Sequence, residues 1–432
     1  MKIIKQLISC AIVALLSISC GEDRTYQYLE LTKENQWIYS TMKSNYLWAD
    51  SIKEPSRNDF FSKNRDFFNK LLTKEDKTSY FSDSALLTSY GMSFAIMRDP
   101  LGIKPSDTYA LVLFVEPHSP ADNAGVKRGT WISQVGKNTI TTNNYGYLER
   151  GGSTTLHTKR IITQEEAPYY CWADGDTLTM KQATTLNSCA LYMDTIYNLR
   201  NHKIGYLVYN RFDPKNSADE TITALQRMHS QGITDLIIDL RYNSGGSLET
   251  ATKIASTLVP PTATGKIFCK LEGNKENSKT YTYEETSQHL ETRTTYLLTT
   301  KATRGAAEAF AAALQNTIGN DKVIIVGENT AGDNLYTQTI ESPYNFNISP
   351  ATGNLYTANG NALPNNGLHT NYTLNELAYF YKIYEIGEEQ EYMLYNTMYL
   401  ITYGTLPQNS NRHNINNPIK THHIEQGKSI LQ

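Results

Sequence analysis

The sequence predicts a multidomain α/β protein with three successive parts: an N-terminal helical cap, a β-rich domain and a larger α/β core. Three observations support this class. The chain of 432 residues is too long for one ordinary hydrophobic core. Its residues are 40% hydrophobic, which is enough to fill more than one core. The apolar spacing also changes along the chain, from helical periodicity to short strands and then to alternating strands and helices.

The charge and the metal-ligating residues exclude some classes of function. The formal net charge is −3 at pH 7, and lysines and arginines are scattered, so nucleic acid is not an expected partner. No clustered histidines and cysteines have metal-ligand spacing, and we expect neither a metal nor another cofactor. Cys171, Cys189 and Cys269 allow at most one intramolecular disulfide, for which Cys171 and Cys189 are the nearer pair.

Residues 1–20 are expected to be a lipoprotein signal peptide. A short basic start precedes an apolar stretch, and a small residue, Ser19, precedes Cys20. Cys20 would be lipidated after cleavage. The alternative, a single membrane-anchoring helix, is too short and ends at the polar residues 21–24. We therefore expect an exported protein, attached by lipid to a membrane of the cell envelope, in the periplasm or on the outer-membrane surface.

Residues 21–82 are predicted to form the helical N-terminal region. Ile38, Met42 and Tyr46 recur at helical spacing, and a second group of apolar residues lies between positions 60 and 72. Aromatic residues at this spacing usually belong to a core rather than to a ligand site.

Residues 83–190 are predicted to form the β-rich domain. Short strands are expected at residues 110–115 and 131–137, with a short helix between them bracketed by proline and glycine. Residues 141–180 are expected to form an enlarged hairpin. Upstream, residues 91–94 could form a loop whose backbone N–H groups hold a peptide's terminal carboxylate, and a plain strand start is the alternative.

Residues 191–405 are predicted to form the α/β core, because strands and helices alternate there. A strand at 204–209 and a helix from Ser217 are followed by a buried strand at 236–241. Gly245 and Gly246 follow that strand directly. Their N–H groups could converge on an anion as an oxyanion hole does, although a tight turn that needs glycine is equally compatible.

The core is organised around residues 298–333. A strand runs into small residues at Gly305, an alanine-rich helix follows, and a second strand ends in a loop at Asp333. In an α/β hydrolase this is where a nucleophile and its base would be expected. Helices are also predicted at residues 374–380 and 388–399, and residues 406–432 are expected to be a loose polar tail.

Together these segments resemble the C-terminal processing (tail-specific) protease family, over residues 37–400. The resemblance is carried by Ser119-Pro120-Ala121 and Ala124-Gly125 in a PDZ-like pattern, by Asp239-Leu240-Arg241 with Asn243 and Gly245-Gly246, and by Gly327-Glu328 with Thr330 and Gly332. It implies a helical cap, a PDZ-like domain and a protease core. It also implies peptide binding by Gly91, Met92, Ser93 and Phe94, and backbone stabilisation of an oxyanion by Gly245, Gly246 and Ala306.

Members of this family are serine peptidases with a Ser–Lys dyad, and neither dyad residue is present here. Alignment on Glu308 places Gly305 at the serine position, and alignment on Glu328 places Asp333 at the lysine position. Gly305 has no atom with which to attack, so no catalytic residue of the dyad is intact. Arg304 also replaces a small residue beside the nucleophile position.

The leading hypothesis is a lipoprotein homologue that has lost peptidase activity and still binds peptides or unfolded protein C-termini. One alternative is an active serine endopeptidase with a displaced nucleophile, for which Ser244 and Lys301 are the candidates. Another is a purely structural envelope lipoprotein that binds no peptide. Degradation and peptide-binding assays distinguish the three.

Overall fold

The computed structural model describes residues 25–82, 88–186, 189–213, 217–274, 277–408, 418–425 and 428–431. The predicted signal peptide, including Cys20, lies outside these residues. Within the described part of the chain, no helix is both long and apolar enough to cross a membrane.

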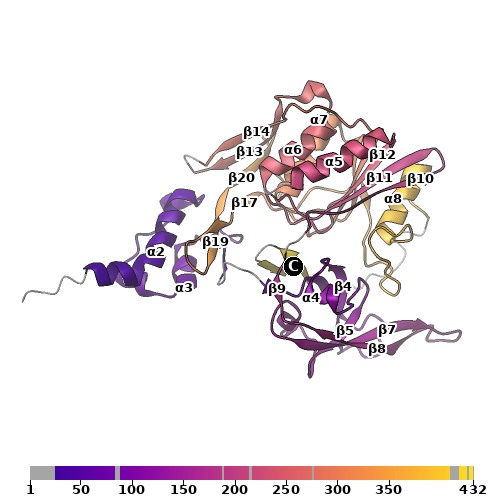
Figure 1. Ribbon diagram of the computed structural model, residues 1–432, viewed down its shortest axis with the longest axis horizontal. Helices are drawn as coiled ribbons and strands as arrows, with labels where there is room; N and C mark the ends of the chain where they lie inside the picture. Colours follow the sequence, from indigo (N-terminus) through magenta and orange to yellow (C-terminus); the bar gives the residue numbers. More distant parts are fainter. Residues whose placement is uncertain are drawn as a thin grey trace, which may run out of the picture.

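The N-terminal region is helical, as predicted, and projects from one end of the molecule (Figure 1). Helices α2 (Thr25–Asn45) and α3 (Asn64–Leu71) enclose a small core around Met42 and Phe68. Short 3-10 turns, Ala49–Ser51 and Arg57–Phe61, connect them. The region ends in strand β1 (Tyr80–Ser82), which pairs with β19 (Asn347–Ser349) from the core and so attaches the cap.

The β-rich domain, residues 88–185, contains one large antiparallel sheet. The strand predicted at residues 110–115 is β4, and the strand predicted at 131–137 is β5. The enlarged hairpin predicted over residues 141–180 is formed by β7 and β8. The order in this sheet is β23-β22-β3-β4-β5-β7-β8. Its elements are β2 (Thr88–Ser89), β3 (Met92–Arg98), β4 (Thr108–Val115), α4 (Pro120–Asn123), β5 (Trp131–Val135), β6 (Asn138–Thr139), a 3-10 turn (Tyr145–Leu148), β7 (Thr154–Thr163), β8 (Tyr170–Met180) and β9 (Thr184–Thr185).

The core is built on a six-stranded sheet in the order β10-β11-β12-β15-β16-β21. Strand β10 is antiparallel to β11, and the other neighbours are parallel, which is typical of a core in which strands and helices alternate. The elements are β10 (Leu191–Leu199), β11 (His202–Tyr209), α5 (Ser217–Ser230), β12 (Asp235–Asp239), α6 (Leu248–Leu258), β15 (Thr295–Thr299), α7 (Ala306–Ile318), β16 (Val323–Gly327), β21 (Tyr372–Thr373) and α8 (Tyr392–Tyr403).

The two faces of this sheet pack against different elements, because successive side chains along a strand point to opposite faces. Leu236 and Ile238 of β12 pack with helices α5, α6 and α7. Ile237, between them, faces α8 and the β-rich domain. A second sheet, β14-β13-β20-β17, packs beyond α6 and α7, as Figure 1 shows. It comprises β13 (Ile267–Gly273), β14 (Lys279–Thr282), β17 (Leu335–Thr337) and β20 (Ala351–Thr357), while β18 (Ile340–Glu341) pairs with β19.

The structure differs from the predicted local structure in three places. Residues 374–380 form turns rather than a helix, and α8 begins at Tyr392 rather than near Glu388. The polar tail is not loose throughout, because residues 420–425 form β22 and residues 428–431 form β23. Strand β3 offers an edge with unpaired backbone groups, and pairing with β22 satisfies them although the tail itself is polar.

Candidate active site

Gly305 lies at a sharp turn between β15 and the first residue of α7, as the sequence predicted. Its backbone has φ 56° and ψ −117°, a left-handed conformation that strongly favours glycine. A strained strand-to-helix turn of this kind exposes the nucleophile in α/β hydrolases. A Cβ atom placed on Gly305 would meet no described atom within 4 Å. The turn therefore keeps space for a side chain that the sequence does not supply.

Glu308 brings Gly305 and Asp333 together. Its Oε2 atom accepts hydrogen bonds from the backbone N–H of Gly305 at 3.1 Å and of Asp333 at 2.9 Å. Its Oε1 atom accepts from the N–H of Gly332 at 2.8 Å and from the hydroxyl of Thr330. Burial raises the pKa of Glu308, and these bonds oppose that shift. One carboxylate thus fixes both dyad positions next to each other.

The loop after β12 carries Gly245 and Gly246, two of the three residues predicted to offer an oxyanion-type backbone. The N–H of Gly245 is engaged, because it donates to Asn243 Oδ1 at 2.9 Å. A Cβ on Gly245 would stand 3.0 Å from the carbonyl oxygen of Arg304 and 3.2 Å from the nitrogen of Ala306, so the two loops touch. Among the described residues, no hydrogen bond from the N–H of Gly246 or Ala306 is found. Of the three predicted N–H groups, that of Gly245 is therefore already engaged within its own loop.

A buried network of ion pairs fixes the start of the loop after β12. Arg241 is fully buried, and its Nε atom donates to both carboxylate oxygens of Asp239 at 3.0 Å. Its Nη1 atom donates to Glu391 Oε1 at 2.8 Å. Glu391 is the N-cap of α8 and also accepts from Leu394 N at 3.0 Å. Although burial alone would raise it, Arg241 and Arg128 hold the pKa of Glu391 below its usual value.

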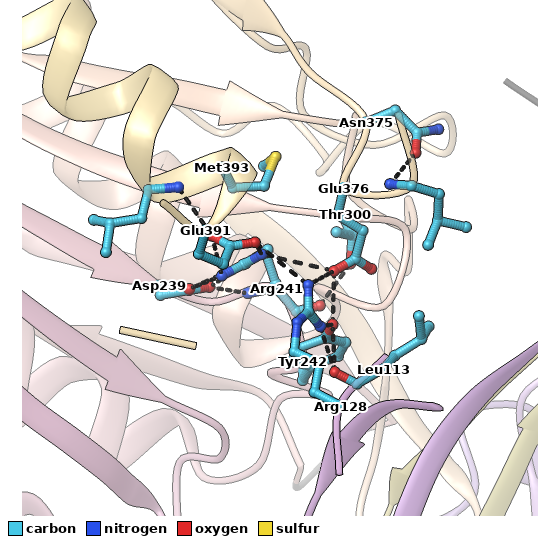
Figure 2. A network of polar contacts seen from close by, with 12 residues as sticks. Leu113, Arg128, Asp239, Arg241, Tyr242, Thr300, Asn375, Glu376, Glu391 and Met393 are labelled. Atoms are coloured by element: carbon cyan, nitrogen blue, oxygen red, sulfur yellow. Dashed lines mark hydrogen bonds and ion pairs between the residues drawn. The ribbon is translucent and has the colours of Figure 1, made fainter. Parts of the chain in front are cut away.

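Arg128 joins the β-rich domain to the same network (Figure 2). Its Nη2 atom lies 3.2 Å from Glu376 and 3.3 Å from Glu391, and its Nη1 atom donates to the hydroxyl of Tyr242. Tyr242 in turn donates to Glu376 at 2.6 Å. Sequence reasoning missed Arg128, Glu376 and Glu391. Arg128 lies 248 and 263 positions from the two glutamates, so no local pattern could have linked them.

Ser244 and Lys301, the candidates for a displaced dyad, lie in two different loops of the core. Ser244 is half-buried in the loop, whereas Lys301 is exposed at the end of β15. Lys301 lies near Glu328. Burial raises the pKa of Glu328 to about 7, and the charge of Glu376 adds to this increase, whereas the charge of Lys301 opposes it.

Gly91 directly precedes strand β3, and residues 92–94 belong to that strand. Gly91 has φ 85°, and a Cβ there would stand 2.2 Å from the Cβ of Ser119 at the start of α4. Met92, Ser93 and Phe94 are the first residues of β3 and are buried. Phe94 pairs with Val112 on one side and with His422 on the other. The strand start that the sequence offered as an alternative is therefore present, and carboxylate binding by residues 91–94 stays a prediction.

The remaining chemical groups are simple to describe. Cys171, Cys189 and Cys269 are all free thiols, so the pairing considered for Cys171 and Cys189 does not occur. In the part of the chain that is described, no group of three or more histidine, cysteine, aspartate or glutamate side chains could hold a metal ion.

Comparison with known proteins identifies the family. Residues 203–374 match the model of peptidase family S41, and residues 33–82 match the S41 N-terminal domain. A "Probable CtpA-like serine protease" of Staphylococcus epidermidis is 21% identical over 72% of this chain and 58% of its own length. The "Carboxy-terminal processing protease CtpB" of Bacillus subtilis is 20% identical over 72% of this chain and 62% of its own length.

A solved structure agrees with these matches. A protein of Bacteroides fragilis assigned as an S41 protease is 27% identical, with a TM-score of 0.71, over 85% of this chain and 97% of that one. The chain spans only about three fifths of the length of the curated relatives above. The family models and the similarity to this solved structure agree: the chain belongs to peptidase family S41, the family of the C-terminal processing serine proteases.

Proposed function

We propose that this chain is a peptide-binding member of family S41 that does not cleave by a Ser–Lys dyad. The observation that carries the proposal is the pairing of Gly305 and Asp333 through Glu308. The two loops are assembled as a dyad would need, but the hydroxyl and the amine are absent. Loss of the nucleophile in a serine hydrolase lowers turnover by a factor on the order of 10⁶.

Peptide binding is proposed along the β-rich domain, which we interpret as PDZ-like. An extended peptide would add as a strand to the edge of β3, with backbone hydrogen bonds giving affinity. The N–H groups of Gly246 and Ala306 would receive a peptide carbonyl at the neighbouring turn. The ligands would be peptides or unfolded protein C-termini, by analogy with carboxy-terminal processing relatives.

The test is degradation of an unstructured polypeptide with a C-terminal tag. We expect the native chain to leave it intact and to bind it, and the Gly305→Ser/Asp333→Lys variant to cut it. A Gly305→Ala/Asp333→Lys variant is the matched control, because it adds the same lysine and a similar Cβ without a hydroxyl. Gly305 has room for either side chain.

Cleavage by the native chain would overturn the proposal. If Ser244→Ala or Lys301→Ala abolishes that cleavage, and a serine-directed probe labels Ser244, the chain is instead an active peptidase with a displaced nucleophile. Absence of both cleavage and binding by the native chain would instead favour a purely structural lipoprotein.

We also propose that Cys20 carries a lipid that anchors the exported chain in the cell envelope. The proposal rests on the signal-like sequence of residues 1–20. Metabolic labelling with a radioactive fatty acid should label the native chain and not a Cys20→Ala variant. Equal labelling, or none in either, would contradict it.

A further inference from the structure

The edge of β3 is already occupied by the chain's own late segment. Strand β22 is antiparallel to β3, with Lys420 opposite Ile96, Thr421 opposite Ala95 and His422 opposite Phe94. The N–H of Ile419 also donates to the carbonyl of Ile96 at 2.7 Å. In Figure 1 this strand lies between the α/β core and the β-rich domain. It takes the place in which a peptide ligand would add.

The direction of the segment is also that of the expected ligand. Residue numbers along β22 rise as those along β3 fall, so the segment runs toward Gly91 at the start of β3. A peptide whose carboxyl end approaches that turn would run the same way. The segment then reverses into β23, which pairs with β22 from His422 to Glu425. An internal stretch of this chain therefore mimics a bound peptide strand.

The first of two consecutive histidines contacts the β-rich domain. The ring of His422 stacks on Phe94 with centroids 4.8 Å apart and an interplanar angle of 28°. Its Nδ1 atom lies 3.4 Å from Glu149 Oε1. The ammonium group of Lys420 lies 5.0 Å from the ring centroid of Tyr145. These contacts specify a planar ring opposite Phe94.

The second histidine faces the candidate active site. His423 is buried, and its ring centroid lies 5.9 Å from that of Tyr242. Tyr242 belongs to the loop that carries Gly245. It is close enough to Arg304, next to Gly305, for that charge to lower its pKa. Its Nδ1 atom is buried and has no hydrogen-bond partner among the described residues. The segment therefore reaches from the β3 edge to the residues beside Gly305.

Aliphatic side chains contribute little to the attachment of residues 418–423. Among residues 418–423 the only buried side chains are the two imidazoles, and no aliphatic side chain is buried. Burial of apolar surface is the main source of packing free energy, and an unpaired buried polar atom costs free energy. Backbone pairing thus supplies much of the attachment, and another extended chain could supply the same bonds.

We propose that residues 418–425 are an internal ligand of the peptide groove, and that a polypeptide binds there only by displacing them. This rests on the proposed function, because it assumes that the groove accepts peptides in trans. It adds that the groove is closed in the resting chain and that its preferred ligand places a planar ring opposite Phe94.

The test compares an opened and a locked groove, with a fluorescent peptide of the sequence of residues 418–425 as the probe. His422→Asp removes the ring and places a second carboxylate beside Glu149, so it should open the groove. Ile419→Asp is the matched control, since that side chain in the same segment is exposed. We expect peptide affinity to rise at least about tenfold in His422→Asp and to stay within about twofold of native in Ile419→Asp.

The locked form joins the strands covalently. Thr421 and Ala95 are directly opposite, so Thr421→Cys/Ala95→Cys can form a cross-strand disulfide. Cys171 and Cys189 are replaced by serine in every variant to prevent other pairings. We expect no peptide binding by the oxidised form and native binding after reduction, while each single-cysteine variant binds as native does in both conditions.

The outcomes separate this inference from the function on which it rests. Equal affinity of the native, His422→Asp and oxidised forms would overturn the internal ligand and leave peptide binding intact. Failure of both the opened variant and the native chain to bind either this peptide or the unstructured polypeptide would overturn the proposed function, and the inference with it.

Discussion

At the scale of single residues, two glycines near the candidate site meet opposite constraints. Gly305 and Gly246 both have positive φ, 56° and 119°. A Cβ on Gly305 would enter open space, whereas one on Gly246 would stand 2.2 Å from the carbonyl oxygen of Phe212. Gly305 is therefore needed only for its backbone conformation, and Gly246 also for the close approach of two loops.

Gly246→Ala is predicted to destabilise the fold strongly. The alanine would force the loop away from Phe212, in addition to the strain of positive φ, which costs about 1–3 kcal/mol. Gly360→Ala is the matched control, because Gly360 has φ 79° and a Cβ there would meet nothing within 4 Å. In urea unfolding, Gly246→Ala should lower the free energy of unfolding by at least about 2 kcal/mol more than Gly360→Ala does. Equal losses would show that the loops are not tightly apposed.

Glu308→Gln is predicted to loosen the loop that carries Asp333. The carboxylate accepts four hydrogen bonds, and an amide can accept at only one of its two terminal atoms. Hydrogen bonds to charged groups contribute about 1.5–3 kcal/mol each, so a loss of about 2–4 kcal/mol is expected in urea unfolding. Glu285→Gln, on an exposed side chain, should change stability by less than about 0.5 kcal/mol. Similar stabilities of the two variants would argue against this role of Glu308.

At the scale of elements, the attachment of β22 involves two ionisable side chains, those of His422 and His423. Burial lowers the pKa of His422 to about 4 and that of His423 to about 3, with Arg304 and His422 adding to the shift of His423. The facing groups are Phe94 and Glu149 for His422, and Tyr242 and Arg304 for His423. Both imidazoles are therefore neutral while the strand is docked.

Docking of β22 is predicted to weaken in acid. A released imidazole has a pKa near 6.5, so it binds a proton that the docked one does not. The docking free energy is therefore fully present above about pH 6.5 and is lost as the pH falls toward 4, by about 2 kcal/mol per histidine at pH 5. Hydrogen exchange of the β3 amides, corrected for intrinsic rates, should accelerate between pH 7 and pH 5. A His422→Gln/His423→Gln variant should lack this dependence, and its persistence there would refute the assignment.

At the scale of the whole molecule, Arg128 connects the β-rich domain to the core. It extends from the β-rich domain and ends in the network of Figure 2, where it is buried with Glu376, Glu391 and Tyr242. Arg128 and Arg241 face three carboxylates there, those of Asp239, Glu376 and Glu391. Removal of one arginine leaves buried negative charge without compensation.

Arg128→Met is predicted to destabilise both domains together. Breaking a buried ion pair by removing one partner costs about 3–5 kcal/mol, and methionine keeps most of the apolar stem. The adjacent Lys127→Met is the matched control, since that ammonium group is exposed. In urea unfolding, the free energy of unfolding should fall by about 3–5 kcal/mol in Arg128→Met and change by less than about 1 kcal/mol in Lys127→Met. A native midpoint for Arg128→Met would show that the domains do not depend on this contact.

The local sequence was sufficient for the elements of the core. Apolar strands, an alanine-rich helix and punctuating glycines predicted β12, β15, α7 and β16, because their periodicity reports burial directly. Motif spacing also placed Gly305 and Asp333 at the two dyad positions, and the structure brings them together through Glu308. The helix predicted at residues 374–380 failed because apolar spacing alone does not distinguish a helix from packed turns.

By itself, the sequence determined the family-like order of elements and the absence of a serine and a lysine from their expected places. Only the tertiary structure decided that Arg128 enters the core network, that Gly245 donates its N–H to Asn243, and that residues 420–425 pair with β3. The physical reason is distance along the chain. Periodicity and capping act over a few residues, whereas His422 and Phe94, or Arg128 and Glu391, meet only after the chain has folded.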